Sequence, residues 1–286
     1  QRNTFHSGNS ETTLQHYTLL PHQKQILDKL HVERENKGNF KNLIVAATGT
    51  GKTVISAFDY QEFARTHSSS RILFTAHREE ILIQSLKTYR SVLQDSNFGT
   101  LWVGNNCPKE ADEYEHLFIS INMFNTRYEE LFSKLDPNFY DYIVIDEAHH
   151  SQADSYRKLF EHFKPQLLIG LTATPERMDG RDLRPDFGGY ISAEIRLPQA
   201  LQAGLLTPFQ YLCVSDDTDL SDDSLWNGQK YNTNLLANKL CSKTRAQLIV
   251  NALHKYLADE YTCKALCFCV NKQHADFMAE QLKQSG

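Results

Sequence analysis

The sequence lacks an apolar run of the roughly 18 residues that a membrane-spanning helix requires, so we predict no membrane contact. It also lacks a signal-peptide pattern, and we therefore expect a cytoplasmic protein. No internal repeat or low-complexity tract is found, so nothing indicates a repeat architecture. The first residue is Gln1 rather than Met, which leads us to expect an excised or processed piece. Residues 1–16 are then a polar N-terminal extension.

Cysteine pairs spaced as Cys-x-x-Cys are absent among the six cysteines, which argues against a zinc site. We expect reduced core thiols, and we predict that Cys267 and Cys269 lie on one face of a buried strand. An excess of basic residues is lacking too, because 30 Lys and Arg against 35 Asp and Glu give a net charge of −5. The overall charge therefore does not support nucleic-acid binding, although a local basic stripe would suffice.

The sequence does contain an alternation of short apolar runs and amphipathic stretches. This alternation predicts an α/β fold with a parallel sheet wrapped by helices. The strand candidates are nearly continuous in Ile, Val, Leu and Phe, as strands buried on both faces must be. They span 43–47, 71–75, 117–120, 142–146, 167–171 and 208–214. Helices are predicted over 21–34, 52–65, 79–93 and 156–163.

An acidic, turn-rich stretch that starts at Ser215 indicates a domain boundary. We assign residues 17–214 to a first domain, 215–240 to a linker and 241–286 to the beginning of a second domain. In this last part the pattern predicts helices over 244–257 and 273–283 and a buried strand over 264–270. Residues 241–286 are too few to complete a parallel α/β domain, which needs about 100 residues.

Residues 46–53, Ala-Ala-Thr-Gly-Thr-Gly-Lys-Thr, form a phosphate-binding P-loop between a predicted strand and a predicted helix. Glycines in the loop let the backbone turn its N–H groups toward phosphates, and the helix N-terminus adds positive dipole. We predict that Lys52 reaches the β- and γ-phosphates of ATP and that the Thr53 hydroxyl binds Mg²⁺. The predicted ATP-binding residues of the loop are Thr48, Gly49, Thr50, Gly51, Lys52 and Thr53.

A second motif is the acidic pair Asp146 and Glu147 at the end of an apolar strand. A buried strand delivers such residues to the carboxyl edge of the sheet, where ligands bind in α/β folds. We predict that Asp146 holds Mg²⁺ and that Glu147 orients the hydrolytic water. With Lys52, these two residues form the candidate catalytic set.

Three further residues are candidates for coupling ATP hydrolysis to movement. His149 follows the acidic pair and could link the γ-phosphate to a neighbouring domain. Thr172 and Thr174 follow another buried strand and place two hydroxyls near the same edge of the sheet.

Four segments, 46–53, 75–82, 144–149 and 171–175, resemble motifs I, Ia, II and III of superfamily 2 helicases of the DEAH type. This resemblance implies a RecA-like P-loop NTPase domain. The segment 265–282 looks like motif IV, which implies the start of a second RecA-like domain. Gln23 resembles the glutamine that reads adenine upstream of the P-loop in this family.

The run 169–179 is similar to the ATPases of type I and type III restriction enzymes, a branch that often carries an upstream nuclease domain. The resemblance covers about residues 17–286. Motifs V and VI of the family, which supply arginine fingers, do not occur in this sequence. We therefore expect low ATPase activity from this chain alone.

Arg78 follows a strand on the face where members of this family bind a nucleic-acid strand. We predict that it contacts backbone phosphate, because a motor must step over any base sequence. Ser120 and Asn122 are predicted to serve the same strand.

These observations favour an ATP-dependent helicase or translocase that hydrolyses ATP with Mg²⁺ and moves along DNA, in restriction or repair. Only the resemblance favours DNA, so an RNA helicase stays open as an alternative. A nucleotide-dependent switch or scaffold without motor activity is the other alternative. A small-molecule P-loop kinase is disfavoured by Glu147 beside Asp146 and by the Thr172–Thr174 element.

Overall fold

The computed structural model describes residues 14–104, 106–148, 153–175, 182–228, 230–257, 259 and 262–285. The chain divides into two compact units, Gln1–Pro208 and Phe209–Gly286. Residues 215–240, which the sequence marks as a linker, group with the second unit and include a helix, α7 (Thr233–Leu240). Among the described residues, no helix combines the length and the apolar content needed to cross a bilayer.

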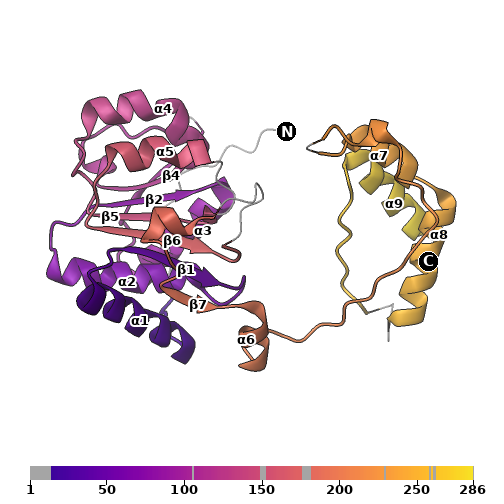
Figure 1. The fold of residues 1–286 in the computed structure, drawn as a ribbon, viewed down its shortest axis with the longest axis horizontal. Helices are drawn as coiled ribbons and strands as arrows, with labels where there is room; N and C mark the ends of the chain where they lie inside the picture. The colour runs from indigo at the N-terminus through magenta and orange to yellow at the C-terminus, as the bar shows by residue number, and fades with distance from the viewer. Residues whose placement is uncertain are drawn as a thin grey trace. The chain divides into compact units, whose positions relative to one another are not determined.

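A parallel sheet forms the centre of the first unit (Figure 1). Its strands are β1 (Lys41–Ala46), β2 (Ile72–Ala76), β3 (Thr100–Trp102), β4 (His116–Ser120), β5 (Tyr142–Ile145), β6 (Leu167–Thr172) and β7 (Ala193–Ile195). They are ordered β3-β4-β2-β5-β6-β1-β7, and every pairing is parallel. The predicted α/β class is confirmed. The predicted set omits β3 and β7, because runs of three residues carry no periodic signal.

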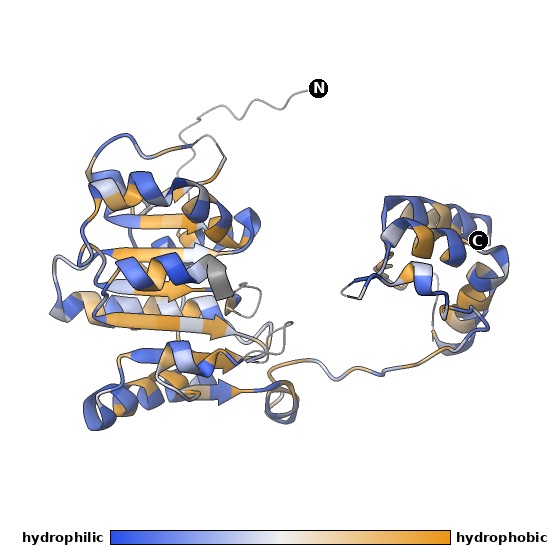
Figure 2. Ribbon diagram, turned by 45° about the horizontal axis from the view of Figure 1, so that its top comes forward, coloured by the Kyte–Doolittle hydropathy of each residue, from blue (hydrophilic) through white to orange (hydrophobic). Residues whose placement is uncertain are grey.

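Helices cover both faces of this sheet. The described helices of this unit are α1 (Pro21–Lys37), α2 (Lys52–Thr66), α3 (Glu79–Leu93), α4 (Ile121–Lys134), α5 (Ala153–His162) and α6 (Leu197–Gln202), with short 3-10 turns η1 (Asp112–Tyr114) and η3 (Arg184–Phe187). Side chains of α1, α2 and α3 share a core with strand residues such as Ile44 and Phe74. Those of α4 and α5 share a second core with the alternate strand residues Leu43 and Leu73. Burial on both faces explains why the strands are almost uniformly hydrophobic (Figure 2).

The second unit contains η4 (Asp223–Leu225), α7, α8 (Lys243–Tyr256) and α9 (Lys272–Gln284). Both α7 and α8 pack against α9, and their small core includes Ala246, Val250 and Met278. The predicted helices over 244–257 and 273–283 are therefore confirmed within one residue at each end.

Two predicted strands are wrong, because residues 208–214 and 264–270 have no regular structure. Leu266 and Phe268 are 87% and 93% exposed, Cys267 is exposed and Cys269 is half-buried, so this segment is not part of a core. An apolar run becomes a strand only where a neighbouring strand can pair with its backbone N–H and C=O groups. The described residues of the second unit include no such neighbour.

Candidate nucleotide-binding site

The carboxyl edge of the sheet collects the loops that carry the predicted site residues. Ala76 of β2 pairs with Ser120 of β4, and Thr75 of β2 pairs with Ile145 of β5. Beyond β5 lie β6 and then β1, which leads into the P-loop. Parallel strands deliver their following loops to one edge. The nucleotide candidates therefore follow β5, β6 and β1, whereas the nucleic-acid candidates follow the neighbouring strands β2 and β4.

The P-loop turns sharply between β1 and α2. Gly49 and Gly51 have φ values of 90° and 86°, in the left-handed region that glycine adopts without strain. A Cβ atom on Gly51 would clash with the side-chain amide of Gln23, and one on Gly49 would lie 3.0 Å from the side chain of Leu206. The loop therefore needs glycine at both positions. Leu206 is a neighbour of the loop that our sequence reasoning missed.

The first turn of α1 contacts the P-loop. Gln23 accepts a hydrogen bond from the Leu20 N–H over 3.0 Å and donates one to the Thr50 carbonyl over 3.2 Å. An amide side chain can make four hydrogen bonds, so Gln23 has capacity for two more. His22, which our sequence reasoning also missed, contacts the same carbonyl over 2.9 Å. The only sequence signal for His22 was its position directly before Gln23.

The structure brings together the three residues of the predicted catalytic set. The Lys52 Nζ atom donates to the Ala46 carbonyl over 3.3 Å and lies 3.8 Å from Glu147 Oε1. The Lys52 side chain is only 9% exposed. Asp146 is buried, and its N–H donates to the Thr75 carbonyl over 2.8 Å, which ties the end of β5 to β2.

Asp146 lies in an environment that disfavours its charge. Burial and, to a smaller extent, the neighbouring Glu147 charge raise the pKa of Asp146 to about 6. Two opposing effects are smaller: the Glu147 N–H donates to Asp146 Oδ1 over 2.8 Å, and Lys52 is nearby. Two neighbouring carboxylate charges, one of them buried, destabilise the folded state unless a cation compensates them.

The donor chemistry of the site fits Mg²⁺. Mg²⁺ prefers oxygen ligands and usually takes only one or two carboxylates from the protein beside the phosphates. Asp146 supplies a carboxylate, and Thr53 supplies a hydroxyl in the first turn of α2. Within the described ranges there is no cluster of three or more His, Cys, Asp or Glu side chains that could hold a metal ion on its own.

Of the three coupling candidates, the structure describes Thr172 and Thr174. Thr172 ends β6 and pairs in the sheet with Val45 of β1. It therefore lies on the strand next to the one that leads into the P-loop. Its hydroxyl donates to the Thr174 carbonyl over 2.6 Å and accepts from the Thr174 N–H over 3.1 Å. These bonds shape the turn after β6. His149 lies outside the described residues, and the coupling roles stay predictions.

The nucleic-acid candidates lie at the ends of two adjacent strands. Arg78 is exposed and directly precedes α3, after β2. Ser120 ends β4, and its hydroxyl caps α4 by accepting from the Met123 N–H over 3.1 Å. Asn122 is exposed in the first turn of α4. The Ser120 hydroxyl is already engaged as a cap, so Arg78 is the strongest phosphate-binding candidate of the three.

The sequence of this chain is similar to those of a known protein family. The family model described as "Type III restriction enzyme, res subunit" matches residues 16–177. The type I restriction enzyme EcoAI endonuclease subunit of Escherichia coli is 26% identical over 91% of this chain. The Saccharomyces cerevisiae protein IRC3, provisionally named an ATP-dependent helicase, is 26% identical over 94% of this chain. The chain spans only 34% and 39% of the lengths of these two relatives.

A solved structure supports the same fold. The fragment structure of a protein provisionally named an HsdR subunit of a type I restriction enzyme, from Vibrio vulnificus YJ016, has a TM-score of 0.60 at 22% identity. It covers 92% of this chain, and this chain covers 44% of it. The predicted RecA-like fold is thereby confirmed. Since the family model covers more than half of the sequence, this chain belongs to the type III restriction enzyme res-subunit family of superfamily 2 helicases.

Proposed function

We propose that this protein binds ATP with Mg²⁺ and hydrolyses it to move along DNA. The observation that carries the proposal is the convergence of Lys52, Asp146 and Glu147 at the carboxyl edge of one parallel sheet. An ammonium group, a buried carboxylate and a second, more exposed carboxylate are the groups that phosphoryl transfer to water requires.

Each residue of the site has a proposed role. The P-loop N–H groups bind the phosphates, and Lys52 exchanges its contact with Glu147 for the β- and γ-phosphates. Thr53 and Asp146 hold Mg²⁺, which when bound neutralises phosphate charge. Glu147, released from Lys52, accepts a hydrogen bond from the attacking water. Gln23 uses its remaining hydrogen-bonding capacity on adenine.

One observation supports DNA as the track, and a second supports a nucleic-acid track in general. The family and the EcoAI relative are restriction enzymes, which act on DNA. Arg78 and Ser120 follow β2 and β4 at the same edge as the nucleotide site, where a strand of DNA would lie beside β5. Contacts from these positions would go to backbone phosphates, which carry no sequence information.

Steady-state phosphate release tests the proposal. From the 286-residue chain we expect slow turnover that requires Mg²⁺ and that rises when single- or double-stranded DNA is added. Stimulation by RNA alone would favour the RNA helicase alternative. ATP binding without stimulation by any nucleic acid would favour the switch or scaffold.

Lys52→Ala is the control variant for the P-loop. It removes a charge-assisted contact worth about 1.5–3 kcal/mol, so we expect ATP affinity to fall by at least about tenfold. The midpoint of thermal unfolding should stay close to that of the natural sequence. Unchanged ATP affinity in this variant would contradict the P-loop assignment.

A further inference from the structure

Two side chains of α1 donate to one carbonyl group of the P-loop. His22 Nε2 lies 2.9 Å and Gln23 Nε2 lies 3.2 Å from the oxygen of Thr50. A carbonyl oxygen can only accept, so the hydrogen of the His22 ring is on Nε2. The same oxygen has two lone pairs, and these two donors occupy both.

This contact is buried rather than exposed. His22, Gln23 and Thr50 are 8%, 4% and 2% exposed. Within the described part of the chain, the other ring nitrogen of His22, Nδ1, is buried and has no hydrogen-bond partner. A buried polar atom without a hydrogen-bond partner destabilises the folded state, and an apolar side chain of similar shape would avoid this cost. The presence of histidine therefore points to a role for the Nε2 donor.

The bond to Thr50 controls the direction of a neighbouring N–H group. The peptide between Thr50 and Gly51 is trans and planar, so its N–H points opposite to its carbonyl. Gly51 adopts a φ of 86°, and glycine rotates more freely than any other residue. Holding the carbonyl against α1 therefore fixes the orientation of the Gly51 N–H, one of the groups that cradle phosphate in the proposed function.

We propose that His22 is a positioning residue that orients the P-loop for the phosphates before nucleotide binds. The inference rests on the proposed function, and it adds a residue that acts through the Thr50 carbonyl without touching the nucleotide. Gln23 supplies the weaker and longer of the two bonds, so it alone holds the carbonyl less firmly. Pre-orientation of this kind lowers the ordering cost of binding and so raises phosphate affinity.

Two substitutions separate the hydrogen bond of His22 from its packing. His22→Gln keeps an N–H donor at a similar reach, whereas His22→Phe keeps a flat ring without a donor. Dissociation constants of the 286-residue chain would be measured by calorimetry for ATP and for inorganic tripolyphosphate, both with Mg²⁺. We expect His22→Phe to weaken both ligands by about five- to tenfold, the effect of one hydrogen bond. His22→Gln should restore most of the loss.

The outcomes distinguish this inference from the function on which it rests. If the natural sequence binds neither ligand, the proposed function fails. If it binds both and His22→Phe binds them equally well, only the role of His22 is overturned. An equal loss in both variants would indicate packing, and a loss confined to ATP would indicate the adenine side; either result overturns the inference. Thermal unfolding checks the fold, and His22→Leu replaces the phenylalanine variant if that one does not fold.

Discussion

Glu147 occupies a backbone region that residues with a side chain rarely adopt. Its φ is 49°, and a conformation of this kind costs about 1–3 kcal/mol. Two hydrogen bonds hold the turn: the Asp146 N–H donates to Thr75, and the Glu147 N–H donates to Asp146. The turn brings the Glu147 carboxylate to within 3.8 Å of the Lys52 ammonium. The strained residue is thus the one to which we assign the activation of water.

Substitutions at the acidic pair should separate binding from turnover. Glu147→Gln keeps the shape of the side chain and removes its charge, so we expect retained ATP and Mg²⁺ binding with turnover lowered by about 10²–10⁴-fold. Asp146→Ala should instead weaken ATP binding that depends on Mg²⁺. Calorimetry and phosphate release would measure the two effects. Equal effects of both substitutions on binding and on turnover would contradict this division of roles.

The raised pKa of Asp146 predicts a pH dependence of stability. Its folded-state pKa of about 6 lies above the ordinary value of an aspartate, so the folded protein binds this proton more tightly than the unfolded chain does. The stabilising contribution is complete below a pH of about 4 and is lost as the pH rises through about 6. The difference corresponds to about 3 kcal/mol.

We therefore expect Asp146→Asn to raise the free energy of unfolding at pH 7.5 when Mg²⁺ is absent. At pH 4 the two proteins should differ little, because the aspartate is then protonated in the folded state. Urea titrations at both pH values would measure this. If Asp146→Asn destabilised the protein equally at both pH values, burial would not be the cause of a raised pKa at Asp146.

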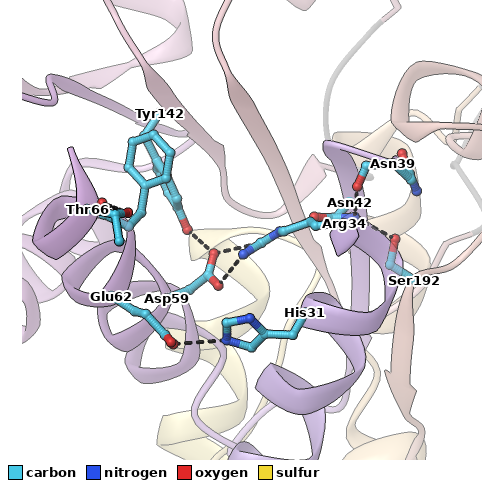
Figure 3. Close-up of polar contacts among 10 residues, drawn as sticks. His31, Arg34, Asn39, Asn42, Asp59, Glu62, Thr66, Tyr142 and Ser192 are labelled. Carbon is cyan, nitrogen blue, oxygen red and sulfur yellow. Dashed lines mark hydrogen bonds and ion pairs between the residues drawn. The ribbon is translucent and has the colours of Figure 1, made fainter. Parts of the chain in front are cut away.

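At the scale of elements, a buried polar network joins four of them (Figure 3). The Arg34 guanidinium of α1 donates to both carboxylate oxygens of Asp59 on α2, each over 2.8 Å, and to Asn42 on β1 over 2.9 Å. The Tyr142 hydroxyl of β5 donates to the same carboxylate. The Arg34 and Asp59 side chains are 12% and 2% exposed. This network fixes α1 and α2, the helices that carry Gln23 and Lys52, against the sheet.

Breaking this network should cost far more than breaking an exposed hydrogen bond between the same helices. Arg34→Met leaves the Asp59 charge buried without its partner, so we expect a loss of about 3–5 kcal/mol in the free energy of unfolding. The matched control is His31→Ala, which removes the exposed contact to Glu62 and should cost less than about 1 kcal/mol. Urea titration measures both variants. Similar small losses in both would mean that the buried pair does not brace the helices.

The sequence predicted the strands that consist of long apolar runs, but it missed the 14-residue helix α4 (Ile121–Lys134) and the short strands β3 and β7. The segments from 142 and from 167 consist of continuous apolar residues, and β5 and β6 follow them within a residue. The run 264–270 is also largely apolar but has no pairing strand among the described residues, so its apolar content alone did not predict its structure. The P-loop and the acidic pair are recognisable because their chemistry requires particular residues in order. His22 was not recognisable, because its role depends on a contact across 28 positions.

At the scale of the whole molecule, every described residue of the proposed nucleotide site belongs to the first unit. Gln23, Thr53 and Glu147 lie within Gln1–Pro208, as do both cores of the sheet. We expect a variant that ends at Pro208 to fold and to bind ATP with the affinity of the 286-residue chain. Calorimetry with Mg²⁺ and ATP tests this. A clear loss of affinity in the shortened variant would mean that the second unit contributes to nucleotide binding.

The exposed side chains of Leu266 and Phe268 have a practical consequence for handling the protein. Exposed apolar residues in an unpaired, extended segment favour self-association, and ammonium sulfate strengthens the effect. The 286-residue chain should therefore aggregate at lower concentration than a variant that ends at Pro208, and should bind hydrophobic dyes more strongly. Phe268→Ser should raise the concentration at which the chain stays monodisperse in light scattering. Colloidal behaviour is thus controlled by a segment that contains none of the residues assigned to ATP.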